Sequence, residues 1–492
     1  MNDSSELRGL ALATLFPGFL GAHDVPPWLA ELAADGLGGV VLFGRNVDPA
    51  RGDAGVAALT RRLHELNPDL LVGIDEEGGD VTRLDVATGS TLPGNAALGA
   101  LDDPAATERV AAEVGARLRA GGIDLNFAPV ADVDSNTLNP VIGVRSFGFD
   151  PDIVARHVAA WVAGQQAQGV AATAKHFPGH GGTSEDSHLT VPSIDDPLDV
   201  IQTRDLPPFR AAVKADVKIV MTAHIRFPAL DGDRPATLSR RVVTDVLRDE
   251  LGYDGLVMTD GMDMHAISRT VGHAEGAVLA LLAGVDALCV GGDTVDPGTV
   301  EAMAAALVQA VRSGRLPEER LAEAAGRVQA LRRWLRDVRP PAVVHGAAAD
   351  AARRAITVHG DVTLSAPPLV IELDDDPSMA AGPVPWGVGR HLADRLPGTV
   401  VARVTASTAD LSAVIAALPS RRLVIGVRGV RRRPWQAEVV SAARVARPDL
   451  VVVDHDVNPL PEVLGSHYVL THGAARVTAE AAADLLAGLG GV

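Results

Sequence analysis

Charged and imidazole side chains gather at the ends of several short apolar runs in this 492-residue sequence. Asp75 closes one run, Lys175 and His176 close another, and His224 and Asp260 close two more. Carboxylates and imidazoles are the groups that commonly act as nucleophiles, acids and bases in enzymes. A buried charge without a partner is costly, so four polar strand ends at one rim predict a shared polar cleft.

The apolar runs themselves predict the elements that must position these residues. They alternate with helix-compatible stretches such as 152–168 and 239–251. Continuous apolar runs are typical of parallel strands that are covered on both faces. The predicted strands cover residues 10–16, 39–43, 70–75, 124–130, 172–177, 219–225, 255–260 and 285–290. This alternation predicts a (β/α)8 barrel, a fold whose chemistry lies at the carboxyl ends of its strands.

The barrel is expected to occupy residues 1–341. A predicted helix at 317–338 ends just before Pro340-Pro341, which cannot continue it. Residues 342–366 are predicted to be a linker, and the alternation resumes over residues 367–492. Predicted strands in that last part lie near Leu369, Val400, Leu423, Val451 and Tyr468, with helices at 434–445 and 479–488. We therefore expect a smaller C-terminal α/β sandwich domain.

Composition limits the classes of partner. The formal net charge of -18 repels phosphate backbones and anionic lipid, so neither nucleic acid nor a membrane is expected as a partner. The single cysteine, Cys289, excludes an internal disulfide. Residues 1–9 lack a basic region followed by an apolar core, and no apolar run is long enough to span a bilayer. A cytoplasmic location is therefore expected, whereas the oligomeric state stays open.

One segment is specific enough to suggest a family. It reads Lys175-His176-Phe177-Pro178-Gly179-His180-Gly181 and continues through Thr183 to Asp186-Ser187-His188. This segment resembles the signature loop of the N-acetylglucosaminidases of glycoside hydrolase family 3. Further blocks resemble the same family in the same order, at residues 74–79, 126–130, 139–147 and 256–264. The resemblance implies a retaining β-N-acetylhexosaminidase that removes terminal N-acetylglucosamine from β-glycosides without a metal or cofactor.

The resemblance also assigns the catalytic groups. A retaining glycosidase forms a covalent glycosyl-enzyme, and its two working groups lie about 5 Å apart. Asp260 fits the nucleophile, because the strand before it restricts its carboxylate. The acid and base implied by the resemblance is His188, oriented by Asp186. In an extended loop residues two apart point to the same side, so Asp186 can accept a proton from one ring nitrogen. Asp263 competes with Asp260 and is given a capping or structural role.

Sugar recognition is likewise carried over residue by residue. The resemblance implies that the terminal sugar is bound by Asp75, Arg83, Arg145, Lys175 and His176. This sequence departs from the family pattern at Asp80, where relatives generally carry arginine, and that departure removes a positive charge near the cleft. It also departs at Gly182 and Gly261, where aspartate and alanine are common. We expect Gly179, Gly181 and Gly182 to permit unusual backbone angles and movement of the loop.

Several other readings stay open. A family 3 β-glucosidase would typically take its acid from a glutamate of a second domain, and a phosphorylase would use phosphate in place of water. A metal hydrolase could use His176, His180, His188 and aspartates. His176 and His180 have the i,i+4 spacing of a helix, but Pro178 and Gly179 between them argue against a helix. A catalytically silent sugar-binding protein would keep the subsite and lose the nucleophile or the acid. Relatives act on peptidoglycan fragments during cell-wall recycling, which is compatible with an acidic cytoplasmic enzyme.

Overall fold

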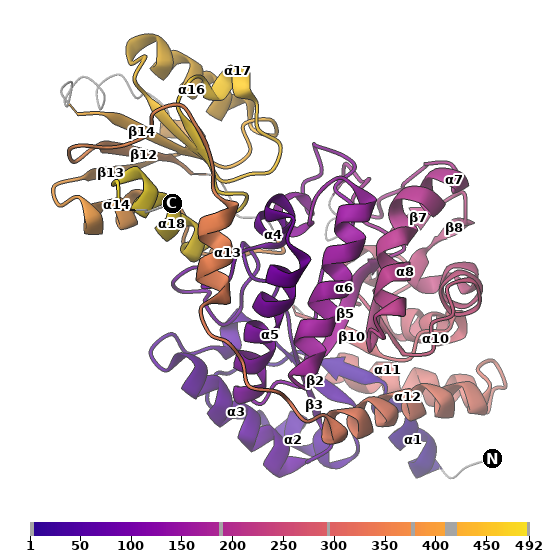
Figure 1. Cartoon of the computed structure of the whole chain (residues 1–492). Coiled ribbons are helices and arrows are strands. Elements are labelled where there is room, and N and C mark those ends of the chain that lie inside the picture. Colours follow the sequence, from indigo (N-terminus) through magenta and orange to yellow (C-terminus); the bar gives the residue numbers. More distant parts are fainter. Residues whose placement is uncertain (1–3, 186–189, 293–295, 375–378, 409–420, 490–492) are drawn as a thin grey trace.

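The computed structural model describes residues 4–185, 190–292, 296–374, 379–408 and 421–489 (Figure 1). Its described residues form two α/β units, with the second unit seated to one side of the first. Both units are built on parallel strands, and each has its own apolar core. The predicted fold class, a barrel followed by a smaller α/β sandwich, is confirmed.

The first unit is a ring of parallel strands. In ring order, the described strands are β1 (Leu15–Pro17), β2 (Gly39–Leu42), β3 (Leu71–Ile74), β4 (Leu125–Asn126), β5 (Ala171–Phe177), β6 (Ile219–Thr222), β9 (Leu256–Thr259) and β10 (Leu288–Gly291). β1 pairs with β10, and single bridges join Gly18 to Val41 and Met258 to Ala287. These contacts close the ring, so the carboxyl ends of all eight described strands meet at one rim.

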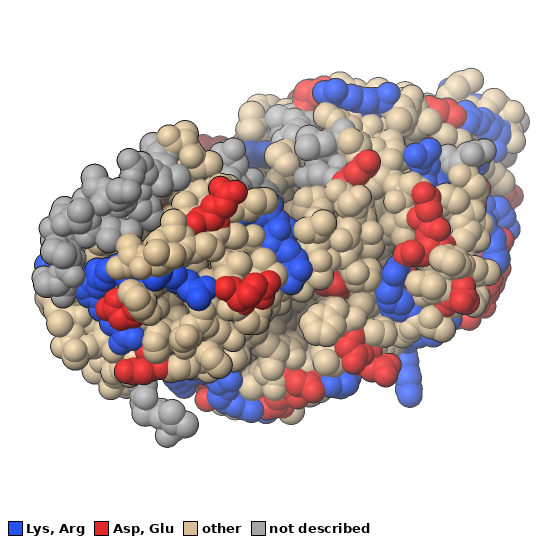
Figure 2. Space-filling model, turned by 90° about the horizontal axis from the view of Figure 1, so that it is seen from above, with Lys and Arg blue, Asp and Glu red and all other residues tan. Residues whose placement is uncertain are grey.

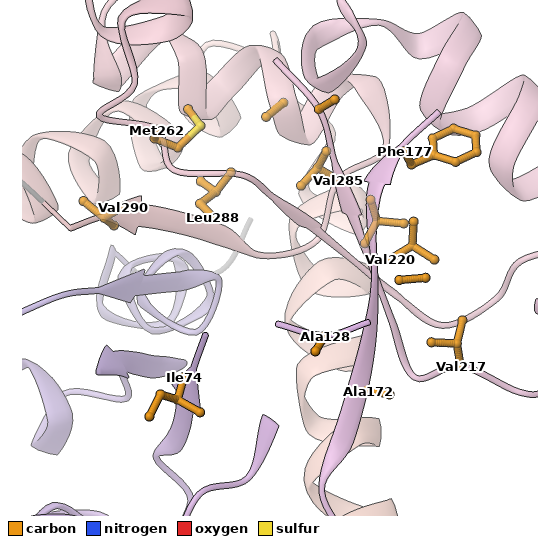
Figure 3. Packing of buried hydrophobic residues seen from close by; sticks show 14 of the residues in the cluster. Ile74, Ala128, Ala172, Phe177, Val217, Val220, Met262, Val285, Leu288 and Val290 are labelled. Carbon is orange, nitrogen blue, oxygen red and sulfur yellow. The ribbon is translucent and has the colours of Figure 1, made fainter. Parts of the chain in front are cut away.

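Alternation along the strands separates an inner from an outer core. Val41, Ile219 and Met258 lie in the cluster inside the ring, whereas Val40 and Val220 belong to the cluster between strands and helices. Successive side chains of a strand point to opposite faces, which explains this division. Figure 3 shows part of the outer cluster, which includes Val220 and Val285. The strands read as continuous apolar runs because both of their faces are buried.

Helices cover the outside of the ring, and several start at an aspartate cap followed by proline. Asp103 caps α5 (Pro104–Ala120), Asp150 caps α6 (Pro151–Ala167) and Asp296 caps α11 (Pro297–Arg312). An aspartate at this position satisfies an unpaired N–H of the first turn, and proline tolerates the first helical position. The other helices of eight or more residues in the described barrel are α1 (Ser4–Leu12), α2 (Pro27–Ala34), α3 (Gly52–Leu66), α8 (Leu206–Lys214), the π-helix η5 (Arg241–Glu250), α10 (His273–Ala283) and α12 (Glu318–Asp337).

α12 closes the amino-terminal end of the barrel. Val328 and Leu331 of this helix join the cluster inside the ring, with Trp334 and Leu335 packed against it. Figure 1 shows α12 running beneath the strands, on the side opposite the second unit. The ring interior is therefore a packed core that is sealed at this end by apolar side chains.

The second unit is a six-stranded sheet in the order β11-β16-β15-β14-β12-β13 among the described residues. Its strands are β11 (Thr357–His359), β12 (Leu369–Leu373), β13 (Val400–Val404), β14 (Leu423–Val427), β15 (Val451–Asp454) and β16 (Tyr468–Leu470). β11 is antiparallel to β16, and the other pairs are parallel. Its two apolar clusters take alternate residues of β14 and β15, so helices cover both faces. These helices are α14 (Gly389–Arg395), α16 (Pro434–Ala446), α17 (Pro461–Leu464) and α18 (Arg476–Leu486).

Two local expectations differ from the structure. The predicted strand 10–16 is helical up to Leu12, and only its end belongs to β1. The segment 342–366 contains the helix α13 (Ala347–Ala355) and the strand β11. α13 buries Ala348, Ala351, Ala352 and Ala355 and packs against α4 (Asn95–Leu101), α5 and α18. The division of the chain at residues 341 and 367 stays our prediction.

The surface carries both signs of charge. On the face drawn in Figure 2, Lys and Arg are interspersed with Asp and Glu over both units. Within the part of the chain that is described, no helix combines the length and apolar character needed to cross a membrane.

Candidate active site

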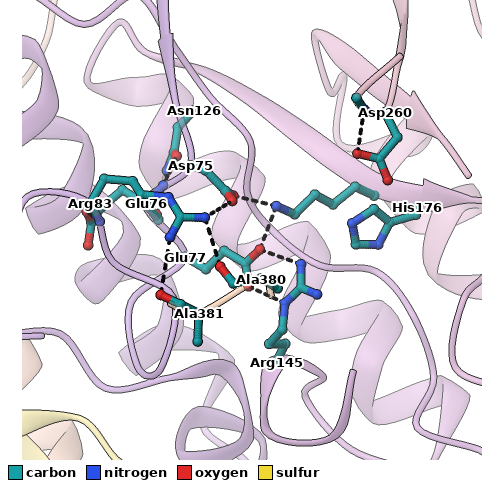
Figure 4. A network of polar contacts seen from close by, with 12 residues as sticks. Asp75, Glu76, Glu77, Arg83, Asn126, Arg145, His176, Asp260, Ala380 and Ala381 are labelled. Atoms are coloured by element: carbon teal, nitrogen blue, oxygen red, sulfur yellow. Dashed lines mark hydrogen bonds and ion pairs between the residues drawn. The ribbon is translucent and has the colours of Figure 1, made fainter. Parts of the chain in front are cut away.

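The barrel places most of the predicted site residues at its carboxyl-end rim. Asp75 directly follows β3, Lys175 and His176 lie near the end of β5, and Asp260 directly follows β9. Figure 4 shows the side chains of Asp75, Arg145 and His176 converging on one region, with Asp260 at its edge. This grouping is the one expected for parallel strands that end at a common rim.

Two carboxylates and three cations form a continuous network at this rim. The Nζ atom of Lys175 lies 2.6 Å from Oδ1 of Asp75 and 2.5 Å from Oε1 of Glu77. Arg145 donates to both carboxylate oxygens of Glu77, over 2.9 and 2.8 Å. Arg83 donates from Nη2 to Oδ2 of Asp75 over 2.9 Å. The network holds charged donors and acceptors in fixed directions, which is the property a site needs to recognise several hydroxyl groups.

The charges of this network stabilise one another. Glu77 is only 2% exposed, and burial alone would raise the pKa of its carboxyl group. The neighbouring Arg145 and Lys175 outweigh burial and hold the pKa of Glu77 well below its ordinary value. Burial likewise works against the Arg145 cation, but Glu77 keeps the Arg145 pKa above its ordinary value. Both side chains therefore remain ionised, and Arg145 is a buried, bidentate partner of Glu77.

His176 is held by a buried aspartate. The Nδ1 atom of His176 lies 2.7 Å from Oδ2 of Asp132, and Asp132 Oδ1 accepts the backbone N–H groups of His176 and His180 over 3.0 and 2.8 Å. Burial raises the Asp132 pKa, but His176 and these N–H donors outweigh it and leave the pKa below its ordinary value. Burial lowers the pKa of His180 to about 4, so His180 is neutral at pH 7. Asp132 thus fixes the orientation of the His176 ring.

Asp260 stands on a turn that a histidine supports. Its backbone N–H donates to the carbonyl of Thr222 on β6, and its Oδ1 accepts the N–H of Gly261 over 2.8 Å. His224 is buried, with its Nε2 atom 2.9 Å from the Gly261 carbonyl and its Nδ1 atom 2.8 Å from Oγ1 of Thr237. Both ring nitrogens of His224 are therefore engaged in holding the Asp260 turn. The sequence indicated a polar strand end here, and the structure assigns it a supporting role.

The predicted acid and its partner, His188 and Asp186, lie outside the described residues. The segment that leads to them is described up to Glu185. There Asn139 donates from Nδ2 to the carbonyls of His180 and Gly181, each over 3.0 Å. A Cβ at Gly181 would lie 1.6 Å from the carbonyl oxygen of Val133. Gly181 is thus required for close packing against the backbone, whereas we expected it to permit loop movement; Gly179 has the expected unusual angle, with φ +145.

Asp80 corrects an expectation about charge. The sequence suggested that its aspartate removes a positive charge near the cleft. In the structure Asp80 forms an ion pair with Arg428 of the second unit, and its Oδ1 accepts the N–H of Ala474 over 2.7 Å. Arg428 follows β14, and its guanidinium lies over the ring of Trp386 at 5.2 Å. A positive charge is therefore present here, but a residue far along the chain supplies it.

Sequence reasoning also missed Glu77, Asp132 and the carbonyl groups of Ala380 and Ala381. Glu77 entered the sequence analysis only as part of the block 74–79, although the charge balance with Lys175 and Arg145 could have indicated it. The two carbonyls accept hydrogen bonds from Arg83 over 2.9 and 3.4 Å. A backbone acceptor leaves no signature in the side-chain pattern. Among the residues that the structure describes, no group of three or more His, Cys, Asp or Glu is arranged to hold a metal ion.

Glu76 gives the site a pH-dependent stability. Its Oε2 accepts the N–H groups of Arg83 and Leu84, and burial raises its pKa from 4.5 to about 7. Between these values the folded protein keeps a proton that the unfolded chain has released, so stability falls as pH rises. Between pH 4.5 and 8 this group should lower the free energy of unfolding by about 3 kcal/mol. We expect Glu76→Gln to remove that part of the pH dependence in urea denaturation at pH 5 and 8.

Comparing wild type with Glu76→Gln isolates the contribution of Glu76 to the pH dependence of stability. Asp134 and Asp454 also have pKa values raised by burial, to about 6 and about 8, but both are present in each protein and their contributions cancel. Equal changes in unfolding free energy for wild type and Glu76→Gln would show that Glu76 titrates normally in the folded protein.

Comparisons with known proteins agree with this arrangement. The family model described as glycosyl hydrolase family 3 N terminal domain matches residues 25–331. The beta-hexosaminidase A of Pseudoalteromonas piscicida is 36% identical over 334 residues, which cover 63% of this chain and 55% of that protein. The beta-hexosaminidase of Methylococcus capsulatus is 37% identical over 255 residues, covering 51% and 75%. This chain therefore matches 55% of the length of the first relative and 75% of the length of the second.

A solved structure resembles nearly the whole chain. The glycoside hydrolase family 3 beta-N-acetylglucosaminidase from Paenibacillus sp. str. FPU-7 superposes with a TM-score of 0.87 and 33% sequence identity. The match covers 99% of this chain and 97% of that one, so it includes both units.

Proposed function

This chain belongs to glycoside hydrolase family 3, and from that premise we propose that it is a retaining β-N-acetylhexosaminidase that releases terminal N-acetylglucosamine from β-glycosides. The observation that carries the proposal is the position of Asp260 at the rim where Asp75, Lys175, Arg145 and His176 meet. The names of the relatives add support, because they describe hexosaminidases and an N-acetylglucosaminidase.

The proposed reaction has two displacement steps. In the first, the carboxylate of Asp260 bonds to the anomeric carbon while the bond to the leaving oxygen breaks, and His188 gives that oxygen its proton. In the second, His188 takes a proton from water, whose oxygen bonds to the same carbon and displaces Asp260. The carboxylate and the protonated imidazole are then regenerated. Asp186 orients the His188 ring and favours its protonated form.

The rim network is proposed to bind the terminal sugar. The Asp75 carboxylate can accept from sugar hydroxyl groups, and Lys175, Arg83 and Arg145 can donate to their oxygens. His176, fixed by Asp132 through one ring nitrogen, presents the rest of its ring to the same region. Because each of these groups is already held by a neighbour, little freedom is lost when a sugar binds.

We also propose a biological setting. The resemblance suggests cell-wall fragments as substrates and peptidoglycan recycling in the cytoplasm as the process, and the acidic net charge of -18 fits a small uncharged or weakly charged substrate.

A paired substrate test separates the proposed function from its rivals. We expect kcat/KM for an aryl N-acetyl-β-glucosaminide to exceed that for the matching β-glucoside by about 10²-fold or more, because a site built for an acetamide leaves its polar groups unpaired without it. The product should be free N-acetylglucosamine, and adding phosphate should change neither rate nor product. A preference for the glucoside would favour the β-glucosidase, a sugar phosphate product would favour the phosphorylase, and binding without turnover would favour a sugar-binding protein.

A further inference from the structure

We propose that the second unit completes the sugar site by positioning Arg83, and that Asp80 and Arg428 are the residues through which it does so. The inference deepens the proposed function and rests on it, because Arg83 and Asp75 matter to turnover only if they bind the sugar.

The guanidinium of Arg83 is held from two sides. Its Nη2 atom donates to Oδ2 of Asp75 and to the carbonyl of Ala380, each over 2.9 Å, and Nη1 donates to the carbonyl of Ala381 over 3.4 Å. Figure 4 shows Arg83 between the Asp75 carboxylate and these two carbonyls. The side chains of Arg83 and Asp75 are only 13% and 18% exposed. A shift of the second unit would therefore move the two carbonyls that hold the Arg83 guanidinium beside Asp75.

The barrel and the second unit fix different parts of this arginine. Glu76, which belongs to the barrel, accepts the backbone N–H of Arg83 over 2.8 Å. The carbonyls of the second unit bind the guanidinium, about five bonds further out. A long arginine side chain has several rotatable bonds, so a fixed backbone alone does not fix its end. The orientation of the guanidinium depends on both units.

Asp80 anchors the loop three residues before Arg83. Its carboxylate is 8% exposed and forms an ion pair with Arg428, while its Oδ1 accepts the N–H of Ala474. Arg428 is itself placed by the ring of Trp386. A buried carboxylate that loses its cation must either move or take up a proton. The Asp80–Arg428 pair is thus a charged link between the second unit and the loop that carries Arg83.

The interface around this link lies close to the site. A cavity of about 60 Å³ lies between the units, lined among others by Asp80, Arg145, Ala381 and Arg428. Arg145 in this lining also binds Glu77 in the rim network. The sugar network and the interface therefore share side chains, which gives a short physical route from Arg428 to the sugar.

The test measures sugar binding and turnover in the full chain. The variants are Arg428→Ala, the reversed pair Asp80→Arg with Arg428→Asp, and the neutral pair Asp80→Asn with Arg428→Gln. We expect Arg428→Ala to weaken binding of N-acetylglucosamine about tenfold in calorimetry and to raise KM of the aryl glycoside similarly, with a smaller change in kcat. The reversed pair should recover most of the lost affinity. The neutral pair buries no unpaired charge, and its affinity should lie between those of Arg428→Ala and the reversed pair.

A matched control removes another contact of the same interface. Arg354 on α13 donates to Asp103 on the barrel over 2.8 Å, and its other hydrogen-bond partner is Asp350 of its own helix. Arg354→Ala should leave the affinity for N-acetylglucosamine and KM unchanged. Thermal unfolding of every variant reports whether it is folded.

Each outcome decides the inference. If Arg428→Ala lowers only the Tm and leaves affinity and KM unchanged, the pair has a purely structural role and the inference is overturned. Equal losses of affinity in Arg354→Ala and Arg428→Ala would overturn it as well. If the reversed pair does not fold, the neutral pair and Arg428→Ala still give the affinity. Wild-type binding of N-acetylglucosamine without turnover would overturn the proposed reaction alone, because positioning is read from the affinity. A wild type that does not bind the sugar would overturn both.

Discussion

Replacing Asp260 with alanine is expected to lower kcat for an aryl N-acetyl-β-glucosaminide on the order of 10⁴-fold. Without the carboxylate no covalent glycosyl-enzyme forms, and the positive charge that develops at the anomeric carbon loses its counter-charge. The folded structure should tolerate the change, since Oδ1 of Asp260 accepts the N–H of Gly261 at a partly exposed turn. Steady-state kinetics together with a thermal unfolding curve measure both effects.

Azide distinguishes a missing nucleophile from any other essential carboxylate. In Asp260→Ala, azide can enter the space of the lost side chain and attack the anomeric carbon, giving an α-glycosyl azide and partial recovery of the rate. Asp263→Asn is the matched control, because Asp263 packs so closely on Gly291 that a Cβ there would lie 1.9 Å from its Oδ1. We expect the control to retain turnover without azide. Full activity in Asp260→Ala, or azide recovery in Asp263→Asn alone, would refute the assignment.

Replacing His188 with alanine should have the second largest effect, and that effect should depend on the leaving group. A poor leaving group needs a proton from the acid, whereas a dinitrophenolate leaves without one. We expect kcat/KM to fall about 10³-fold for an aryl glycoside with a weakly acidic phenol and far less for the dinitrophenyl glycoside. The measurement is kcat/KM for a series of aryl glycosides, and the slope of log kcat/KM against the pKa of the leaving phenol reports this dependence.

Asp186→Ala provides the graded comparison. Because Asp186 only orients and tunes the imidazole, the fall in kcat/KM should be smaller in Asp186→Ala than in His188→Ala. It should again be larger for poor leaving groups than for good ones. In His188→Ala, azide should attack the accumulated glycosyl-enzyme and give the β-azide, opposite to the product of Asp260→Ala. A His188→Ala variant whose rate loss is the same for every phenol would exclude His188 as the acid.

The sequence predicted the barrel rim well because its signal is local. Strands covered on both faces must be apolar throughout, so the polar residues that end them, such as Asp75, Lys175 and Asp260, stand out. Seven of the eight expected strand positions coincide with described strands within a few residues, and only the run 10–16 is largely helical. That run was ambiguous because a short apolar stretch fits a buried helix as well as a strand.

The contacts that the sequence could not reveal are those made by partners distant along the chain. Arg83 and Ala380 are 297 residues apart, and the acceptor is a backbone carbonyl that every residue type carries. Asp80 suggested the loss of a positive charge, because the arginine that pairs with it, Arg428, lies 348 residues away in the sequence. Asp132 follows β4 without a recognisable motif, and only the fold brings it beneath His176. Residue types indicated the chemistry, whereas tertiary packing determined the partners.

The helix that covers the lower opening of the ring limits how the chain could be shortened. Val328 and Leu331 fill the interior from below, and Arg332 donates to the carbonyls of Leu37 and Gly38 ahead of β2. A fragment that stops before these residues would admit water to Phe16, Ile219 and Leu256, and the hydration of that apolar surface would favour unfolding. An excised barrel must therefore retain the chain to at least Leu335 if its interior is to stay dry.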